Sequence, residues 1–332
     1  MTDAFAPREA DQLENVLPPE LNPGPVVGHE PASRHLAQIL SADRLPNAIL
    51  LHGPYGIGKA TLAFQLARQI LAETGDEDAH RVDEQVLAGS HPNLFVLRKS
   101  PKEGRGFYTV IRVDEVRDIK ERLQRTRGRA GHRVAIVDSI DDCNPSAANA
   151  MLKTLEEPPA ATVFILVSHR PGMLLPTIKS RCLSVPLRPL ADDDVRSVLG
   201  AQRPGKSLDH AVELAEGRPR RGFEALALGA EGALTALREW LRSPLSGPDA
   251  AHLAIADALI AEAGGAQGSF ARELITDWLA AEARDAALAG VSARQRLASA
   301  NELWDKAHAL FADAEELNLD ARQTLVGVLD AI

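Results

Sequence analysis

The chain has 332 residues, of which 45% are hydrophobic and 25% charged, so it is long enough for two or three domains with cores of ordinary size. It contains only two cysteines and no apolar run of roughly 18 to 20 residues, which excludes a disulfide framework, a multi-cysteine zinc site and a membrane-spanning helix. The net charge of -9 excludes a surface that binds nucleic acid over its whole extent, so any DNA contact is expected to be local or shared with partners.

The first 24 residues are acidic and interrupted by proline, and they lack the basic start and the apolar stretch of a signal peptide. We therefore predict a mobile N-terminal tail over residues 1–24. The protein is expected to be cytoplasmic and to have no membrane partner.

Short apolar segments alternate with helical patterns between residues 25 and 188, which is typical of a parallel α/β sheet. The expected strands are residues 48–52, 94–98, 133–138, 162–168 and 183–187. The expected helices are residues 30–42, 59–72, 113–127, 145–157 and 173–179. Residues 73–109 hold an acidic stretch, one strand and a basic piece, KSPKEGRG, and we expect a partly ordered insertion there.

After Arg188 the strand patterns stop, and helical patterns follow with glycine or proline between them. A break near Gly229 separates a small three-helix unit, residues 189–229, from a longer helical bundle, residues 230–332. The predicted fold class is α/β, with a parallel sheet domain followed by two helical domains.

A glycine-rich loop, GPYGIGK, lies between the strand-like AILLH and the helical ATLAFQLARQIL, which is the context of a phosphate-binding loop. Its glycines let backbone N–H groups turn toward phosphate oxygens, and the N-terminal end of the following helix favours the same anion. The alternative is a simple glycine turn before a helix. The candidate nucleotide-binding residues here are Gly53, Pro54, Gly56, Ile57, Gly58, Lys59, Ala60 and Thr61.

The position after Lys59 normally carries Ser or Thr, because that hydroxyl binds the magnesium ion between the outer phosphates. Here it is Ala60, and on a helix the Thr61 side chain points about 100° away. Asp138 ends the strand VAIVD as a candidate ligand of the metal, but Ser139 follows where a glutamate would act as general base. We expect impaired magnesium binding and no self-contained ATP hydrolysis. Asp138 is alternatively a loop carboxylate or a helix cap.

From Asp138 the chain runs DSIDDCNPSAANAMLKTLEEPPAATVFILVSHRPGMLLPTIKSRC. Together with the degraded phosphate loop, this block resembles the clamp-loader family of AAA+ proteins, and the similarity begins at Val26. The resemblance implies an AAA+ RecA-like nucleotide-binding domain over residues 25–188, a helical lid over 189–229 and a helical collar over 230–332 for oligomerisation.

The same resemblance implies a hetero-pentameric ring with motor and delta type subunits, which uses ATP to load a sliding clamp onto primer-template DNA during replication. The clamp would be contacted indirectly. ATP or ADP is expected to be bound without turnover. Clamp loaders often carry four zinc-binding cysteines before the Asp138 strand, and because that region has none here, no zinc is predicted.

The Ser-Arg-Cys turn of clamp loaders carries an arginine that reaches the ATP site of a neighbouring subunit, and Arg181 matches it. Its permanently charged, planar guanidinium would stabilise the charge that builds up on the transferring phosphoryl group. The alternative is an arginine that caps a helix end or pairs with a surface carboxylate.

Four further residues match sensing or base-binding positions of the family. Ser168 matches the first sensor, Arg220 matches the second-sensor arginine of the lid, and Val27 with Gly28 matches the segment beside the adenine ring. The alternative for Ser168 and Arg220 is inherited packing or helix initiation.

The segment KERLQRTRGRAGHR, residues 120–133, is strongly basic in an acidic protein and is the candidate contact for DNA phosphates. The alternative is a solvated helix end whose cations favour the helix dipole. The candidate DNA-binding residues are Arg122, Arg125, Arg127 and Arg129.

Two other functions compete with a non-hydrolysing subunit that donates Arg181. One is an active AAA+ ATPase, such as a motor subunit of the loader or a helicase-like motor, against which Ala60 and Ser139 count. The other is a structural scaffold of the ring in which Arg181 has no role.

Overall fold

The computed structural model divides into two compact units, one of Met1–Leu208 with Ala215–Phe223 and one of Asp209–Leu214 with Glu224–Ile332. The expected domain boundaries near residues 188 and 229 stay predictions. The structure describes residues 12–13, 16–22, 24–42, 44–103, 106–125, 129–205, 207–229, 232–244, 250–261, 266–317 and 319–332.

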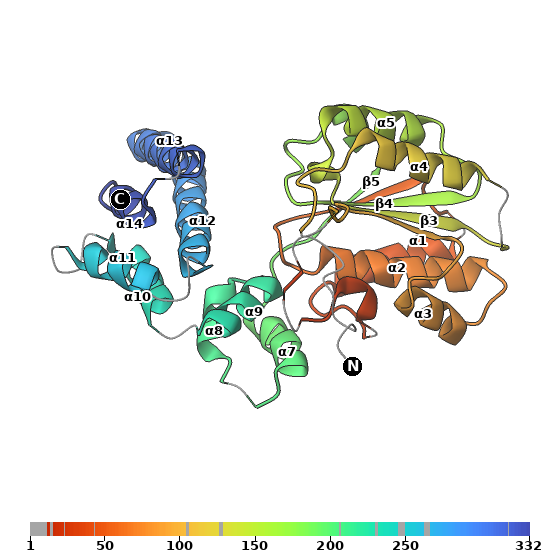
Figure 1. The fold of residues 1–332 in the computed structure, drawn as a ribbon, viewed down its shortest axis with the longest axis horizontal. Helices are drawn as coiled ribbons and strands as arrows, with labels where there is room; N and C mark the ends of the chain where they lie inside the picture. The colour runs from red at the N-terminus through yellow and green to blue at the C-terminus, as the bar shows by residue number, and fades with distance from the viewer. Residues whose placement is uncertain are drawn as a thin grey trace. The chain divides into compact units, whose positions relative to one another are not determined.

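A five-stranded sheet forms the centre of the first unit, and every strand pair in it is parallel (Figure 1). The strands lie in the order β2-β3-β4-β1-β5. All seven residues of β4 are buried, as expected for a strand that is covered on both faces. The strands are β1 (Ala48–His52), β2 (Leu94–Leu97), β3 (Arg133–Asp138), β4 (Thr162–Ser168) and β5 (Leu183–Pro186).

Helices cover both faces of this sheet, with α1, α2 and α3 on one face and α4 and α5 on the other (Figure 1). Apolar residues from one face of β3 and β4 share one buried cluster with those of α4 and α5. The helices are α1 (Glu30–Ser41), α2 (Lys59–Thr74), α3 (Ala79–Leu87), α4 (Val113–Gln124), α5 (Pro145–Glu156) and α6 (Pro176–Lys179), with 3-10 turns η1 (Pro19–Leu21) and η2 (Ile140–Asp142).

The strand register brings the predicted site residues to one edge of the sheet. His52 at the end of β1 pairs with Ser168 at the end of β4, and Asp138 at the end of β3 pairs with Val167. Because parallel strands end at the same edge, the loops after β1, β3 and β4 meet there. This confirms the expected α/β domain with a parallel sheet.

The predicted strands agree with the structure to within one residue at each end, but three predictions about helices were wrong. The helix predicted over 113–127 ends at Gln124, because Arg125 is already in an extended conformation. Residues 73–109, predicted as an insertion with one strand, also contain α3, which Asp78 caps and which buries Val82 and Val86. The helix predicted over 173–179 begins only at Pro176, since proline disfavours helical backbone in the residue before it.

The prediction of a mobile N-terminal tail is also corrected for residues 16–22. Glu20 in η1 is buried, and its carbonyl accepts a hydrogen bond from Arg68 of α2 at 2.5 Å. This part of the segment is therefore packed against the first unit.

The described residues after 188 form helices without strands, as predicted. In the second unit, Leu237 of α10, Leu259 of α11, Ile275 of α12 and Val328 of α14 are fully buried. None of the helices that the structure describes is long and apolar enough to cross a membrane. The helices are α7 (Asp192–Gln202), α8 (Asp209–Ala215), α9 (Pro219–Leu228), α10 (Ala233–Arg242), α11 (Ala251–Ala261), α12 (Ala266–Leu288), η5 (Gly290–Ala293), α13 (Arg294–Glu316) and α14 (Ala321–Leu329).

Candidate functional site

The predicted phosphate loop connects β1 to the start of α2, as its sequence requires. All three of its glycines have a positive φ, so none can be replaced without strain. A Cβ atom on Gly53 would collide with the Leu187 carbonyl oxygen, and one on Gly56, which has a φ of +82°, would lie 2.9 Å from Cβ of Arg220. The loop is therefore packed closely between the end of β5 and the start of α9.

Lys59 is buried and turned onto its own loop. Its Nζ donates hydrogen bonds to the carbonyl oxygens of Gly53 at 2.8 Å and Pro54 at 2.5 Å. Burial lowers the pKa of Lys59 to about 8, while Asp138 and Asp141 act in the opposite direction. The ammonium still carries its proton at pH 7, and an incoming phosphate would replace two carbonyl partners.

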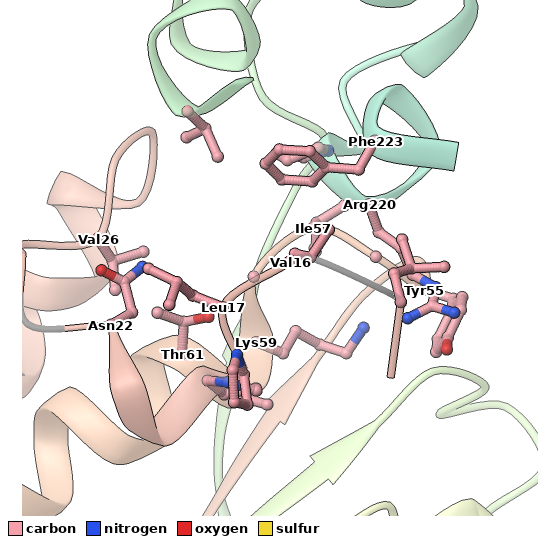
Figure 2. A pocket seen from close by; sticks show the side chains of 18 of the residues that line it. Val16, Leu17, Asn22, Val26, Tyr55, Ile57, Lys59, Thr61, Arg220 and Phe223 are labelled. Atoms are coloured by element: carbon pink, nitrogen blue, oxygen red, sulfur yellow. The ribbon is translucent and has the colours of Figure 1, made fainter. Parts of the chain in front are cut away.

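A cavity of about 410 Å³ opens beside this loop, and all of its lining residues belong to the first unit (Figure 2). In Figure 2, Lys59 lies at the bottom of the pocket, with Val26 and Thr61 on one side of it and Tyr55 and Arg220 on the other. The predicted residues in the lining are Val27, Gly56, Ile57, Gly58, Lys59, Ala60, Thr61, Asp138 and Arg220. The structure thus brings together predicted residues from four separate segments of the chain.

The charged groups that act on Asp138 are the cations Arg98 and Lys59 and the carboxylates Asp142 and Glu20. Burial raises the pKa of Asp138 to about 6, and Arg98 and then Lys59 oppose that rise. The described residues contain no group of three or more His, Cys, Asp or Glu side chains that could hold a metal ion. With Ala60 in place of a hydroxyl, the residues present do not fit the magnesium site of a hydrolytic phosphate loop.

The hydroxyl of Ser139 already has a partner. Ser139 is 2% exposed, and its Oγ donates a hydrogen bond to Oδ2 of Asp142 at 2.9 Å. Lys99 lies 3.6 Å from the same carboxylate oxygen. Because a hydroxyl has no basicity near pH 7 and this one is engaged, Ser139 does not act as a general base toward an attacking water.

Asp141, which sequence reasoning missed, fixes the end of β4. Its carboxylate accepts hydrogen bonds from the Ser168 hydroxyl at 3.0 Å and from the backbone N–H groups of His169 at 2.5 Å and Arg170 at 3.3 Å. Ser168 is fully buried and is absent from the cavity lining. The predicted first sensor thus contacts Asp141. Nothing in the local sequence around Asp141 indicated this long-range role.

Tyr55 and His169 form an aromatic contact across the cavity wall that the sequence did not reveal. The two rings meet edge to face at 4.8 Å, and the Arg220 guanidinium lies over the Tyr55 ring at 4.9 Å. Burial, followed by the charges of Lys59 and Lys99, lowers the pKa of His169 to about 3. His169 is therefore neutral at physiological pH.

Arg220 at the start of α9 also touches the phosphate loop through its backbone. Its N–H donates a hydrogen bond to the Gly56 carbonyl at 3.2 Å. The predicted lid residue and the loop are thus joined by one hydrogen bond and by the contact with Tyr55. This geometry would transmit a change of loop conformation to α9.

The segment predicted to border a base packs against the loop and against Leu190. Gly28 has a φ of +80°, and a Cβ atom there would lie 2.6 Å from Cγ of Leu190. His29 is buried, and its Nε2 lies 2.7 Å from the Ile57 carbonyl oxygen. Burial lowers the pKa of His29, so the ring is uncharged at neutral pH and donates from Nε2.

Arg181 lies after α6 and does not line the cavity of its own chain. Its Nη2 pairs with a carboxylate oxygen of Glu156 at 2.8 Å, and its Nη1 donates to the Thr177 carbonyl at 3.0 Å. The side chain is 37% exposed. The guanidinium is therefore held at the surface, where a partner can reach it.

The candidate DNA-binding arginines lie at and after the end of α4. Arg122 lies 3.8 Å from Asp118 and over the Phe95 ring, and Arg129 pairs with Glu77 at 3.3 Å. Arg125 is the exposed C-cap of α4, and Arg127 lies outside the described residues. β2 and β3 are parallel, so the chain must return through α4 from the edge where β2 ends to the edge where β3 begins. The basic group at the end of α4 therefore lies at the edge where strands begin, whereas the cavity lies at the edge where they end.

Comparison with known proteins gives a consistent set of matches. Residues 28–191 match the sequence model of the family described as DNA polymerase III, delta subunit. A DNA polymerase III subunit delta' of Pseudomonas aeruginosa is 39% identical over 181 residues, which is 52% of this chain and 53% of that protein. The subunit delta' of Escherichia coli K12 is 34% identical over 156 residues, or 46% of this chain and 45% of that protein.

The subunit delta' of Haemophilus influenzae is 32% identical over 206 residues, covering 60% of this chain and 61% of that protein. The chain thus spans about half the length of the first curated relatives it matches. Among solved structures, a DNA polymerase III, gamma subunit-related protein of Thermotoga maritima matches with a TM-score of 0.45 and 19% identity, covering 90% of this chain and 97% of that one.

Proposed function

We propose that the chain is a delta prime type subunit of a clamp loader, because residues 28–191 match the sequence model of the DNA polymerase III, delta subunit family. In this role it acts in the cytoplasm and helps an ATP-driven ring to load a sliding clamp onto primed DNA during replication. The family match carries the proposal, and the geometry of the site supports its finer parts.

The first finer part is that the chain does not hydrolyse ATP by itself. Ala60 supplies no magnesium ligand, and the Ser139 hydroxyl is bonded to Asp142 where a general base would be needed. The phosphate loop and Lys59 remain, so ATP or ADP is bound in the cavity without turnover. Neither zinc nor a firmly held magnesium ion is part of this proposal.

The second finer part is that Arg181 acts on the ATP of a neighbouring subunit. Its guanidinium is absent from its own cavity and is presented at the surface by Glu156 and Thr177. A fixed, always charged fork suits the developing charge of a transferring phosphoryl group, and such arginines are worth about 10³ to 10⁵ in rate. The chain would then contribute to catalysis in the assembly while lacking its own.

The proposed partners are motor and delta type subunits in a hetero-pentameric ring. Large apolar side chains of the second unit are exposed, which supports burial against partner subunits. These side chains are Leu288, Val291, Trp304, Leu317 and Leu319.

The contact with primer-template DNA is proposed to include Arg125, which caps α4 and is exposed. Replacing Arg125 by alanine in the assembled loader should remove about one phosphate contact. The slope of the logarithm of the DNA-binding constant against the logarithm of the salt concentration should then become shallower by about 0.9. Arg122→Ala is the matched comparison because Arg122 already pairs with Asp118. An unchanged slope for Arg125→Ala would remove this contact from the proposal.

ATP turnover tests the proposed function directly. The purified chain with magnesium and ATP should show no turnover, and its addition to the motor and delta type subunits should stimulate theirs. Robust turnover by the chain alone would favour the active ATPase. Assembly without stimulation would favour the scaffold, and failure to assemble would contradict the assignment.

A further inference from the structure

Residues 16–22 form a short segment, here called the strap, that is fixed to the first unit at one end. Two hydrogen bonds from Arg68 of α2 hold its backbone, one to the Glu20 carbonyl at 2.5 Å and one to the Asn22 carbonyl at 3.0 Å. Glu20 itself is 6% exposed and pairs with Arg98 at 3.4 Å. This end is buried and held by charged partners, so we treat it as the fixed end.

The other end of the strap is held much more weakly. The Leu17 backbone N–H donates a hydrogen bond to Oε1 of Gln202, the last residue of α7, at 3.0 Å. This bond is exposed, and the Leu17 side chain is 41% exposed. Among the described residues, this neutral hydrogen bond in contact with water opens more readily than the buried contacts around Glu20.

Between these two ends the strap forms part of the cavity wall. Val16, Leu17, Pro18 and Pro19 line the same cavity as the phosphate loop, and Figure 2 shows Leu17 on the side of the pocket where Val26 and Thr61 lie. The hydrogen bond to Gln202 joins the strap to α7, whose Ser197, Val198 and Ala201 also line the cavity. A molecule on the phosphate loop would therefore be partly enclosed by the strap.

The cavity offers the two kinds of surface that a nucleotide needs. The loop amides and Lys59 suit phosphate groups, whereas apolar side chains from four segments suit a base. The apolar lining residues away from the strap are Val26, Val27, Leu190, Val198 and Phe223.

We propose that the strap is a gate over this cavity, and that a nucleoside di- or triphosphate enters and leaves when the Leu17 end separates from Gln202. The fixed end at Glu20 stays in place during this motion, since Arg68 and Arg98 hold it. The gate rests on the proposed nucleotide site but not on assembly with other subunits. Its effect is on the rates of exchange, because the strap closes the same cavity whether or not it is filled.

The first experiment measures nucleotide exchange in the full-length chain with the N-methylanthraniloyl derivative of ADP in a stopped-flow fluorimeter. Gln202→Leu removes the acceptor for the Leu17 N–H, and Gln202→Glu keeps an oxygen acceptor at the same place. We expect Gln202→Leu to raise the association and dissociation rates together, by about 2- to 10-fold for the loss of one hydrogen bond, with little change in Kd. Gln202 also lines the cavity, so the added charge of Gln202→Glu should weaken nucleotide binding. This variant should not raise both rates together, because it keeps the acceptor for the Leu17 N–H.

The outcomes separate a gate from a passive wall. Unchanged rates in Gln202→Leu, or a change in the dissociation rate alone with a matching change in Kd, would overturn the proposal. Absence of binding in the wild type and in both variants would overturn it as well, and so would binding that appears only after Gln202→Leu, since the proposal expects little change in Kd. Stimulation of loader ATPase is measured separately, so failure of the proposed function would leave these rates interpretable.

Hydrogen exchange provides a readout that needs no nucleotide. Residues 18 and 19 are prolines without an N–H, so Leu17 supplies the only backbone amide signal of residues 17–19. The Leu17 amide should exchange faster in Gln202→Leu than in the wild type and Gln202→Glu. Equal exchange in all three proteins would show that the contact does not hold the strap closed.

Discussion

The phosphate-loop cavity and the surface around Arg181 are two parts of one domain, and in the proposed function they supply different halves of a catalytic site. In the cavity, Lys59 is buried against carbonyls of its own loop, and the positions for a metal ligand and a general base hold Ala60 and Ser139. At the other surface, Arg181 keeps its charge and is exposed beside Glu156. Under the proposed function, a chain without hydrolysis in its own site would still carry a group that serves a neighbouring site.

The strongest test of this comparison is the replacement of Arg181 by alanine. Hydrolysis at the adjoining site should fall about 10³-fold or more, because the guanidinium would no longer stabilise the transferring phosphoryl group. The measurement is single-turnover ATP hydrolysis in a reconstituted loader whose other motor sites are inactivated in their phosphate loops. Arg181→Lys keeps a charge without the planar fork and should recover only part of the rate. If Arg181→Ala left hydrolysis at the adjoining site at the wild-type rate, Arg181 would have no catalytic role there.

The stability of the domain around the cavity should fall in acid because of His169. Its folded-state pKa of about 3 lies below the ordinary value of 6.5, so the unfolded chain binds the extra proton first and stability is lost as pH falls below about 6.5. Between pH 7 and pH 5 the resulting loss in the free energy of unfolding is about 2 kcal/mol. The measurement is hydrogen exchange of the β4 amides.

His169→Gln should lose less stability between pH 7 and pH 5 than the wild type. Asp138, whose pKa is raised to about 6, acts in the opposite direction over part of this range and is present in both proteins, so the difference between them isolates His169. His80→Gln is the matched control, since His80 is exposed beside Glu84. An identical acid response in His169→Gln would contradict the buried, neutral ring.

A hydroxyl at position 60 should make nucleotide binding in the cavity depend on magnesium. In Ala60→Ser, magnesium should tighten nucleotide binding by about tenfold or more, whereas the wild type should show little magnesium dependence. The measurement is isothermal titration with ADP, with and without magnesium. Thr61→Ser is the control, because it leaves the hydroxyl one residue away. Strong magnesium dependence in the wild type would show that the site tolerates Ala60.

The smallest expected effect concerns the carboxylate that holds Arg181. Glu156→Gln removes an exposed ion pair but leaves the hydrogen bond from Arg181 to the Thr177 carbonyl. We expect less than about a fivefold change in hydrolysis at the adjoining site, since exposed pairs contribute little. A loss as large as that of Arg181→Ala would instead make Glu156 a required positioning residue.

Sequence alone determined the strands, the helices that carry strong apolar periodicity and the phosphate loop. Strand runs such as TVFILVS and the glycine spacing of GPYGIGK have a strong local signature, because burial on both faces and close backbone turns constrain residues that are neighbours in sequence. The missing hydroxyl at Ala60 and the missing base at Ser139 were visible for the same reason. The helix α3 was overlooked because it is short and lies in a polar insertion.

Tertiary structure alone decided which distant groups meet. The contacts of Asp141 with Ser168, of Arg220 with Tyr55, and of the strap with Arg68 and Gln202 join residues that are 27 or more positions apart. It also placed the basic end of α4 away from the cavity. Such contacts depend on the register of the sheet and on which surfaces pack together, and a local pattern of residues carries no information about either.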